Sequence, residues 1–137
     1  VYDVTRHDNE ERSFGLLEVL TNGNKSLMFM KDDIHKYILA TKHDAAPEDM
    51  DSKLIADIDL SILGKSHEEF LKYRYEIKEE YKHTALEKFK EEKLKKYEIK
   101  IVNKLLKKKY IYQTEFFREK YEEQAKINLN ETLKKLK

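Results

Sequence analysis

The sequence predicts an all-α protein, and three observations support this fold class. The 137 residues include 3 glycines and 1 proline, so few turns interrupt the chain. Apolar side chains recur three and four residues apart over most of its length, which is the period of an amphipathic helix. We find no convincing strand pattern. We expect one all-helical domain, a bundle of about six helices, with a first half at residues 1–64 and a C-terminal helical bundle at residues 65–137.

Three helices are expected in the first half, at about residues 9–20, 32–43 and 52–63. The tetrapeptide Thr21–Asn24 is a strong stop signal after the first of them. Pro47 lies in the loop before the third. Gly64 follows the third helix, at a position where a left-handed glycine commonly ends a helix.

Hydroxyl residues mark the starts of three long helices in the second half. Ser66 and Glu69 form the capping-box pattern, in which a hydroxyl residue is followed three positions later by Glu, and Thr84 and Glu87 repeat it. Thr114 is suited to cap the last helix. Short connections between long amphipathic helices favour antiparallel packing.

Composition excludes several kinds of site. Cysteine is absent, so disulfides, cysteine-based zinc sites and thiol nucleophiles are excluded. No apolar run is long enough for a transmembrane helix and no signal-peptide pattern is visible, so we expect a cytoplasmic protein without a membrane partner. Gly-rich phosphate loops and paired metal-binding histidines are also missing from the sequence.

Lysines concentrate between Lys82 and Lys109, although the formal net charge is only +1. Such a stripe can hold phosphates or nucleic acid. It can also be a solvated helix face with Glu–Lys neighbours, such as Glu91 and Lys95. No aromatic or arginine set that would read bases accompanies the lysines, so the pattern favours the solvated face over a nucleic-acid partner.

Glu10, Glu11 and His43 are candidate catalytic residues. The two carboxylates lie in the first turn of the first helix, where the helix dipole alone also favours negative charge. On composition alone, this simpler interpretation is preferred. His43 lies at the end of the second helix, where an imidazole either interacts with the helix C-terminus or faces a phosphate as a ligand or general acid.

Asp57 and Asp59 lie in the middle of an otherwise apolar helix. Asp is a poor helix former there and is rarely buried without a partner. On a helical wheel Ile55, Ile58 and Ile62 share one side, and Asp59 lies nearer that side than Asp57. The partner is either a lysine elsewhere in the fold or a divalent metal, and the residues alone leave both open.

Several segments follow one another in a characteristic order: Val1–Asp3, Asp8–Ser13, Ala40–His43 and Ala56–Gly64, then a Tyr-rich segment at 73–81, and 111–114 and 116–133. In this order they resemble a little-characterised family of predicted metal-dependent phosphohydrolases of the HD superfamily. The resemblance spans essentially the whole chain. Its most specific parts are Asn-Glu-Glu-Arg-Ser at 9–13 and Asp-x-Asp-Leu-x-Ile-Leu-Gly at 57–64 taken together.

The resemblance implies an HD-domain-like fold that holds a divalent metal. In HD-superfamily enzymes the metal is bound by an early His, an adjacent His-Asp pair and a distant Asp, and metal-bound water attacks a phosphoester. Such oxygen and imidazole ligands suit manganese, magnesium, iron, cobalt or zinc. The implied function is a hydrolase acting on a small phosphorylated substrate such as a nucleotide.

Carried over by position, the distant metal-binding Asp of the family falls on Asp57 or Asp59. Helical geometry slightly favours Asp59 as the residue that faces inward, and the resemblance does not separate the two. The resemblance also implies that Glu10 or Glu11 orients water or a ligand. It implies that His43 contacts the leaving phosphate or a water near the metal.

The His-Asp pair of the family would precede Val1, and it is absent from this sequence. We therefore expect an N-terminally truncated form of the hydrolase, in which the metal can be lacking. The alternative is a shortened relative that keeps only the fold, as a non-catalytic interaction module. Missing first helices would leave apolar surface exposed, which favours a homodimer.

Overall fold

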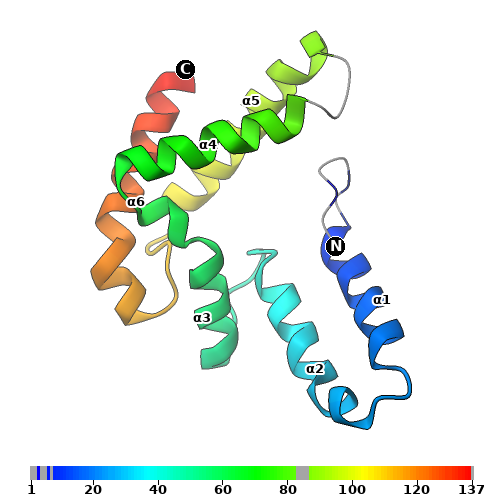
Figure 1. Cartoon of the computed structure of the whole chain (residues 1–137). Coiled ribbons are helices and arrows are strands. Elements are labelled where there is room, and N and C mark those ends of the chain that lie inside the picture. Colours follow the sequence, from blue (N-terminus) through cyan, green and yellow to red (C-terminus); the bar gives the residue numbers. More distant parts are fainter. Residues whose placement is uncertain (1–2, 4–5, 7, 83–86, 137) are drawn as a thin grey trace. The chain divides into compact units, whose positions relative to one another are not determined.

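The computed structural model describes residues 3, 6, 8–82 and 87–136, without the side chains of residues 81, 82 and 87–91 (Figure 1). Six α-helices and one 3-10 helix occur among these residues and no strand does, which confirms the predicted all-α class. Within the described part, none of the helices has the length and apolar character needed to cross a membrane. The chain divides into two compact units, Val1–Asp59 and Leu60–Lys137.

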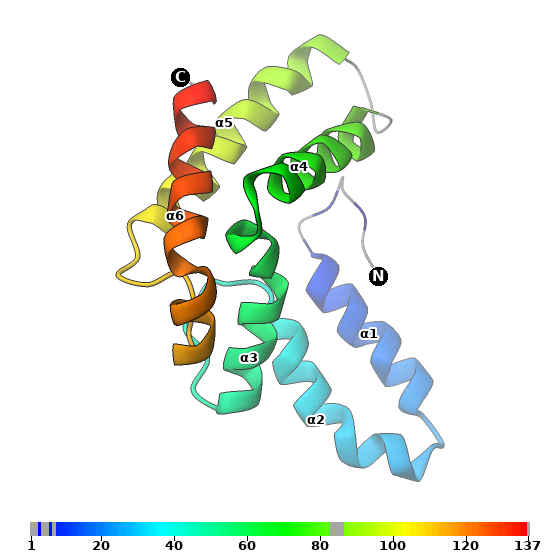
Figure 2. The same cartoon turned by 60° about the vertical axis from the view of Figure 1, so that its left-hand side comes forward.

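The first unit contains three helices, α1 (Asn9–Thr21), α2 (Lys25–Ala40) and α3 (Met50–Asp59). α1 and α2 form an antiparallel hairpin, and α3 packs against α2 (Figures 1 and 2). Gly23 makes the hairpin turn with a φ of 80°. Asn24 caps α2 because its side-chain oxygen accepts a hydrogen bond of 3.2 Å from the amide of Leu27.

Two helix boundaries differ from the prediction. α2 begins at Lys25 instead of near residue 32, because the Asn24 cap starts the helix directly after the turn. α3 ends at Asp59 instead of Leu63, and a 3-10 helix, η1 (Ser61–Gly64), replaces its expected last turn. η1 belongs to the second unit, whereas the sequence places residues up to 64 in the first half.

The α1–α2 hairpin is held by few buried apolar contacts. Phe14 of α1 stacks on His35 of α2 with ring centroids 3.7 Å apart, and Lys31 pairs with Glu18 at 2.8 Å. Among the described residues of this unit, the buried apolar side chains are Ala40 and Ala56, which are both small. Large apolar side chains of the same helices therefore remain exposed.

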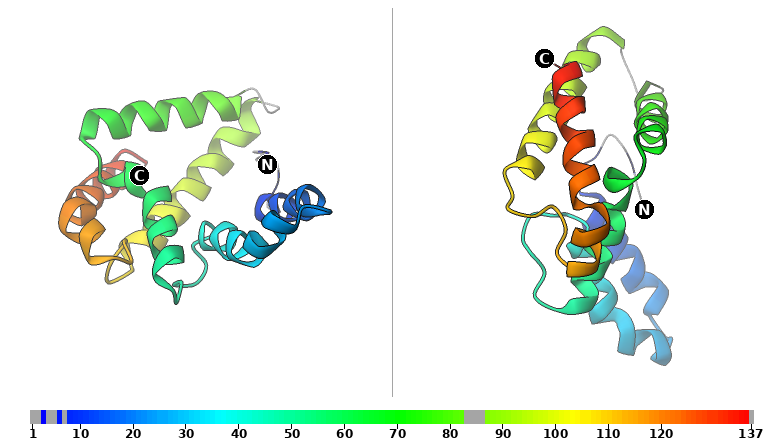
Figure 3. Two further views of the ribbon diagram at one scale, coloured as in Figure 1. Left: turned by 60° about the horizontal axis from the view of Figure 1, so that its bottom comes forward. Right: turned by 90° about the vertical axis from the view of Figure 1, so that its left-hand side faces the viewer.

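The second unit contains η1 and three long helices, α4 (His67–Lys82), α5 (Glu87–Leu106) and α6 (Glu115–Leu136). α5 and α6 lie side by side and antiparallel, as predicted (Figures 2 and 3). The apolar core lies between these two helices and the segment that connects them, with Ile111 and Tyr112 only 1% and 0% exposed. Arg74 of α4 donates a hydrogen bond of 2.9 Å from Nε to Glu98 of α5.

Gly64 allows η1 to approach α6 closely. A Cβ atom at this position would lie 2.7 Å from the carbonyl oxygen of Tyr121 and 2.9 Å from the hydroxyl oxygen of Tyr112. Gly23 is the one glycine with positive φ among the described residues. The expectation that Gly64 ends a helix in the left-handed conformation is therefore wrong, since Gly64 is needed for space rather than for its φ.

Asn128 of α6 fixes the end of η1. Its side-chain nitrogen donates to the carbonyl oxygens of Leu63 and Lys65 at 2.8 and 2.9 Å. Its side-chain oxygen accepts a bond of 3.1 Å from Gln124. Asn128 is fully buried, so these hydrogen bonds replace the bonds to water that its polar atoms lose on folding.

The capping box at the start of α4 is confirmed. Glu69 Oε2 accepts hydrogen bonds from the amide and hydroxyl of Ser66 at 3.2 and 2.6 Å, and Ser66 Oγ accepts from the Glu69 amide at 3.3 Å. Thr84, which was expected to open the second box, lies outside the described residues. α6 begins at Glu115, directly after the predicted cap Thr114.

Candidate functional site

Two side-chain pairs connect the three polar segments selected from the sequence, all within the first unit. Lys42, in the turn after α2, forms an ion pair with Glu11 in the first turn of α1. The next residue, His43, places Nε2 2.7 Å from Oδ2 of Asp59, the last residue of α3. The start of α1, the end of α2 and the end of α3 therefore meet at one end of this unit.

The backbone after α2 explains how neighbouring residues reach two different helices. The amides of Lys42 and His43 donate to the carbonyl oxygens of Leu39 and Ala40 at 3.1 and 3.3 Å, which forms a tight turn. His43 then adopts a φ of 54°, a left-handed conformation that is uncommon outside glycine. Lys42 thus contacts α1 while His43 contacts α3.

The Glu11–Lys42 pair is partly open to solvent. The side chains are 55% and 26% exposed, respectively. The hydrogen bond from Lys42 holds the pKa of Glu11 below its ordinary value, and the same bond raises the pKa of Lys42. The negative charge of Glu10 raises the pKa of Lys42 further, so Glu10 also lies within electrostatic reach of this ammonium group.

Asp57 and Asp59 have opposite environments. Asp57 is 1% exposed, whereas the side chain of Asp59 is 48% exposed and reaches His43. The expectation that Asp59 faces inward is therefore wrong. The isoleucine side of the helical wheel does not mark the interior, because Ile58 is 52% exposed and Ser52 and Ala56 carry the buried face of α3.

Glu10 lines a separate hollow in the first unit, of about 410 Å³, between α1, α2 and α3. Ile34, Tyr37, Ile38 and Ile55 provide most of its wall. Hydroxyl groups at its edge already donate hydrogen bonds, since Ser13 bonds the carbonyl of Asn9 and Thr41 that of Ile38. The two candidate glutamates therefore face different surroundings, an apolar hollow for Glu10 and an ammonium group for Glu11.

The structure adds two residues that sequence reasoning did not select. Lys42 lies inside the Ala40–His43 segment and supplies the cation of the cluster. Asn9, which is 9% exposed, accepts a bond of 2.9 Å from the amide of Asp3 and donates one of 3.0 Å to its carbonyl. These two bonds connect the start of α1 to the segment before it. The position of Asn9 in the Asn-Glu-Glu-Arg-Ser segment was the signal from which this could have been predicted.

Metal binding requires more donors than this end of the first unit brings together. His43 and Asp59 supply an imidazole nitrogen and a carboxylate, which are donor types that suit several divalent ions. In the part of the chain that the structure describes, no group of three or more His, Asp and Glu side chains could hold a metal ion. Two donors do not retain a divalent ion against water, so these residues do not fit the expected metal by themselves.

Comparison with known proteins gave no relative. No protein-family model, no curated protein and no solved structure matches this chain.

Proposed function

We propose that this chain is part of a metal-dependent phosphohydrolase of the HD superfamily that acts on a small phosphoester such as a nucleotide. The observation that supports the proposal best is the contact of 2.7 Å between His43 and Asp59. Both residues belong to the segments that carry the family resemblance. A carboxylate-bound imidazole is an arrangement that suits proton transfer in phosphoester chemistry.

The chemistry available to these residues follows from the hydrogen bond at Nε2. When Asp59 accepts a hydrogen bond from Nε2–H, the neutral His43 ring presents Nδ1 as a proton acceptor. A positioned imidazole of this kind contributes about 10²- to 10⁴-fold as a general acid or base. Lys42, the residue before His43, carries a positive charge that is paired with Glu11 of α1.

The proposal requires metal ligands beyond the described residues, because His43 and Asp59 provide only two donors. The test therefore uses the full-length gene product, with any residues encoded before Val1. Phosphate release from p-nitrophenyl phosphate and nucleoside monophosphates is measured with manganese, magnesium, iron, cobalt or zinc and after chelation. We expect hydrolysis that needs a metal, and inert protein under all these conditions would contradict the proposal.

Variants connect that activity to the described cluster. His43→Gln and Asp59→Asn are expected to lower kcat by about 10²-fold or more if the imidazole moves a proton in the reaction. His67→Gln is the matched control, because His67 contacts the carboxylate of Glu131 at 3.2 Å in the second unit. Equal activity losses in the control and in the cluster variants would point to a general effect on folding.

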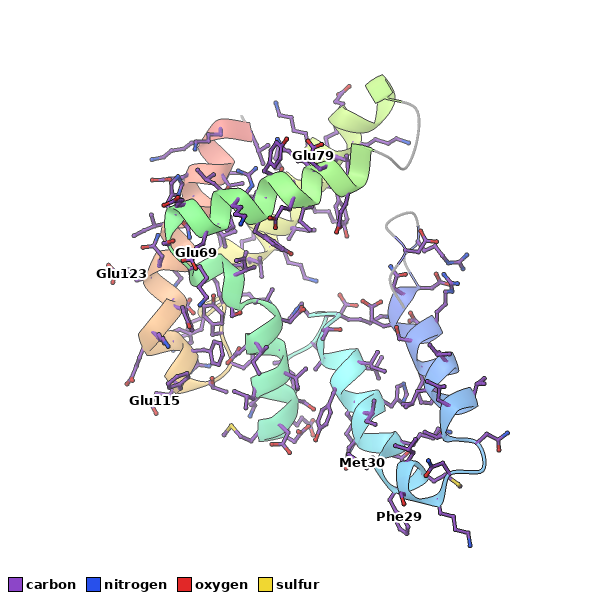
Figure 4. The ribbon with its side chains drawn as sticks, in the orientation of Figure 1. Phe29, Met30, Glu69, Glu79, Glu115 and Glu123 are labelled. Atoms are coloured by element: carbon purple, nitrogen blue, oxygen red, sulfur yellow. The ribbon has the colours of Figure 1, made fainter. Side chains whose placement is uncertain are left out.

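A non-catalytic interaction module is the second candidate, and exposed apolar side chains of the first unit favour it. Phe29 is 89% exposed and Met30 55%, and both lie near the start of α2 (Figure 4). Val19 and Leu20, at the end of α1, are 72% and 61% exposed. Apolar surface of this kind on a soluble domain commonly marks an interaction site, and a homodimer would cover it.

Light scattering after size exclusion tests the second candidate. The module predicts a dimer with no bound metal, and replacement of Phe29 and Met30 by Ser is expected to make it monomeric. Phe116→Ser is the control, since Phe116 is 61% exposed in the second unit. A monomeric wild-type protein over the micromolar range would exclude the dimer, and tightly bound stoichiometric metal would exclude the non-catalytic module.

A further inference from the structure

The connection between α5 and α6 gathers positive charge around one exposed tyrosine. The guanidinium carbon of Arg118 lies 4.3 Å from the centre of the Tyr110 ring, and the ammonium groups of Lys109 and Lys126 lie 5.3 and 6.0 Å from it. Tyr110 is 41% exposed. Tyr110 directly follows Lys109 in the sequence, but only the fold brings Arg118 of α6 to the same ring.

Hydrogen bonds to the backbone hold this cluster in position. Arg118 donates from Nε to the carbonyl of Tyr112 at 2.8 Å and from Nη2 to that of Gln113 at 2.7 Å. Lys126 donates to the carbonyl of Lys109 at 3.4 Å. The ring of Tyr110 is therefore flanked by a guanidinium group whose direction is set by the fold, rather than by a mobile surface side chain.

Positive charge continues from the cluster into the end of α5. Lys104, Lys107 and Lys108 come within the last residues before Tyr110. Burial lowers the pKa of Lys108, and the neighbouring charge of Lys104 lowers it further. Glu122 offsets part of this charge by pairing with Lys126 at 3.0 Å. Its carboxylate also accepts hydrogen bonds from the amides of Ile111 and Tyr112.

Favourable interaction with the carbonyl end of α5 explains why lysines are tolerated there. It does not explain an exposed aromatic ring stacked on an anchored arginine. Proteins that bind single-stranded nucleic acid share two features. A row of cationic side chains contacts the phosphates, and an aromatic ring provides a surface on which a base stacks. We propose that Lys107–Tyr110 and Arg118 form a binding surface for single-stranded RNA or DNA.

Acidic side chains of α6 favour a single strand over an anionic membrane. Glu115, Glu119 and Glu123 are exposed at four-residue spacing, and Figure 4 shows Glu115 and Glu123 projecting outward from α6. Carboxylates exposed along the helix that carries Arg118 and Lys126 would weaken the attraction of a broad anionic surface to this part of the protein. A single strand is narrow enough to follow the lysines alone.

Fluorescence anisotropy with labelled 20-nucleotide oligo(U) and oligo(dT) tests the surface. If four cations contact phosphates, the logarithm of affinity should fall with the logarithm of salt concentration with a slope of about −3, or about 50-fold between 50 and 200 mM salt. Absence of binding to both strands at 50 mM salt would overturn the inference.

Charge-matched variants locate the binding. Replacement of Lys107, Lys108 and Lys109 by Gln should lower affinity by about tenfold or more and reduce the slope to about −1. The control replaces Lys25, Lys36 and Lys53 of the first unit by Gln, which changes the net charge equally and should alter affinity less than twofold. Equal losses in the two triple variants would overturn the location.

Tyr110 variants test the stacking contribution. Tyr110→Ala should weaken binding by about fivefold or more, because a stacked base contributes about 1–3 kcal/mol, whereas Tyr110→Phe should keep the affinity of the wild type. Circular dichroism verifies that each variant is folded. Vesicles of phosphatidylcholine with phosphatidylserine are the last arm, and tighter binding to these vesicles than to either oligonucleotide would contradict the proposal.

Discussion

Asp59 and His43 join the ends of two helices, since Oδ2 of Asp59 lies 2.7 Å from Nε2 of His43. His43 has a left-handed φ of 54°, and Lys42 beside it pairs with Glu11 of α1. Three segments that are far apart in the sequence are thereby connected through adjacent residues of one turn. The consequences for stability and function can be measured separately.

The two aspartates of α3 should differ in their effect on folding. Asp57 is 1% exposed, so Asp57→Ala should lower the free energy of unfolding by about 1–3 kcal/mol, because the groups packed around a buried polar side chain lose its contacts and gain no water in exchange. Asp59→Ala should cost less than about 1 kcal/mol, since the Asp59 side chain is 48% exposed. Urea denaturation compares the two, and a larger loss for Asp59→Ala would contradict the assigned burial.

Gly64→Ala should be strongly destabilising. Its new methyl group would meet the backbone oxygen of Tyr121 at 2.7 Å, so η1 and α6 would have to separate, at a cost of about 1–3 kcal/mol. Gly15→Ala is the control, because it lies inside α1 with nothing within 4 Å, and it should stabilise by about 0.5–1 kcal/mol. Melting temperatures that change equally in the two variants would disprove the close approach.

Asn128→Ala should destabilise the protein much more than the same change at an exposed asparagine of α6. Loss of the bonds to Leu63 and Lys65 leaves two carbonyl oxygens without their donor, which should cost about 2–4 kcal/mol. The matched variant is Asn130→Ala, because Asn130 is exposed and donates only to its own helix, at Lys126. The same urea measurement should give a change below about 1 kcal/mol for Asn130→Ala.

The capping box predicts a dependence of stability on acid. The hydrogen bonds from Ser66 hold the pKa of Glu69 below its ordinary value of 4.5. A carboxylate with a depressed folded-state pKa stabilises fully above its unfolded pKa, and this contribution is lost as the pH falls through the folded pKa. The stability difference between wild type and Glu69→Gln should therefore be present at pH 7 and shrink below pH 4.5. A difference that grows on acidification would contradict the assigned bonds.

Local chemistry made much of the fold predictable. The Ser66–Glu69 box and the stop at Thr21–Asn24 act within a few residues, and the structure agrees with both. The apolar periodicity predicted the helical class, although it did not identify the buried side of α3. The start of α2 lies earlier than the prediction because Asn24 caps the helix directly after the turn at Gly23. Gly64 was misread because its constraint comes from Tyr121, 57 positions later in the chain.

The candidate site was predictable only as a set of segments. Sequence spacing selected Glu11, His43 and Asp59, but it could not show that Lys42 would pair with Glu11 across 31 positions. The inward side of α3 was misjudged because burial depends on which neighbours cover a helix, and the isoleucine stripe is partly exposed. The positive cluster at Tyr110 was not predicted, because Arg118 reaches the Tyr110 ring only in the folded chain.

A double-mutant cycle on His43 and Asp59 tests the functional proposal most directly. Metal-dependent phosphate release by the full-length gene product is measured for wild type, His43→Gln, Asp59→Asn and the double variant. If the two side chains act as one unit, the double variant should lose no more kcat/KM than His43→Gln alone. Losses that multiply independently, or no metal-dependent hydrolysis in the wild type, would contradict the assignment of this pair to phosphoester chemistry.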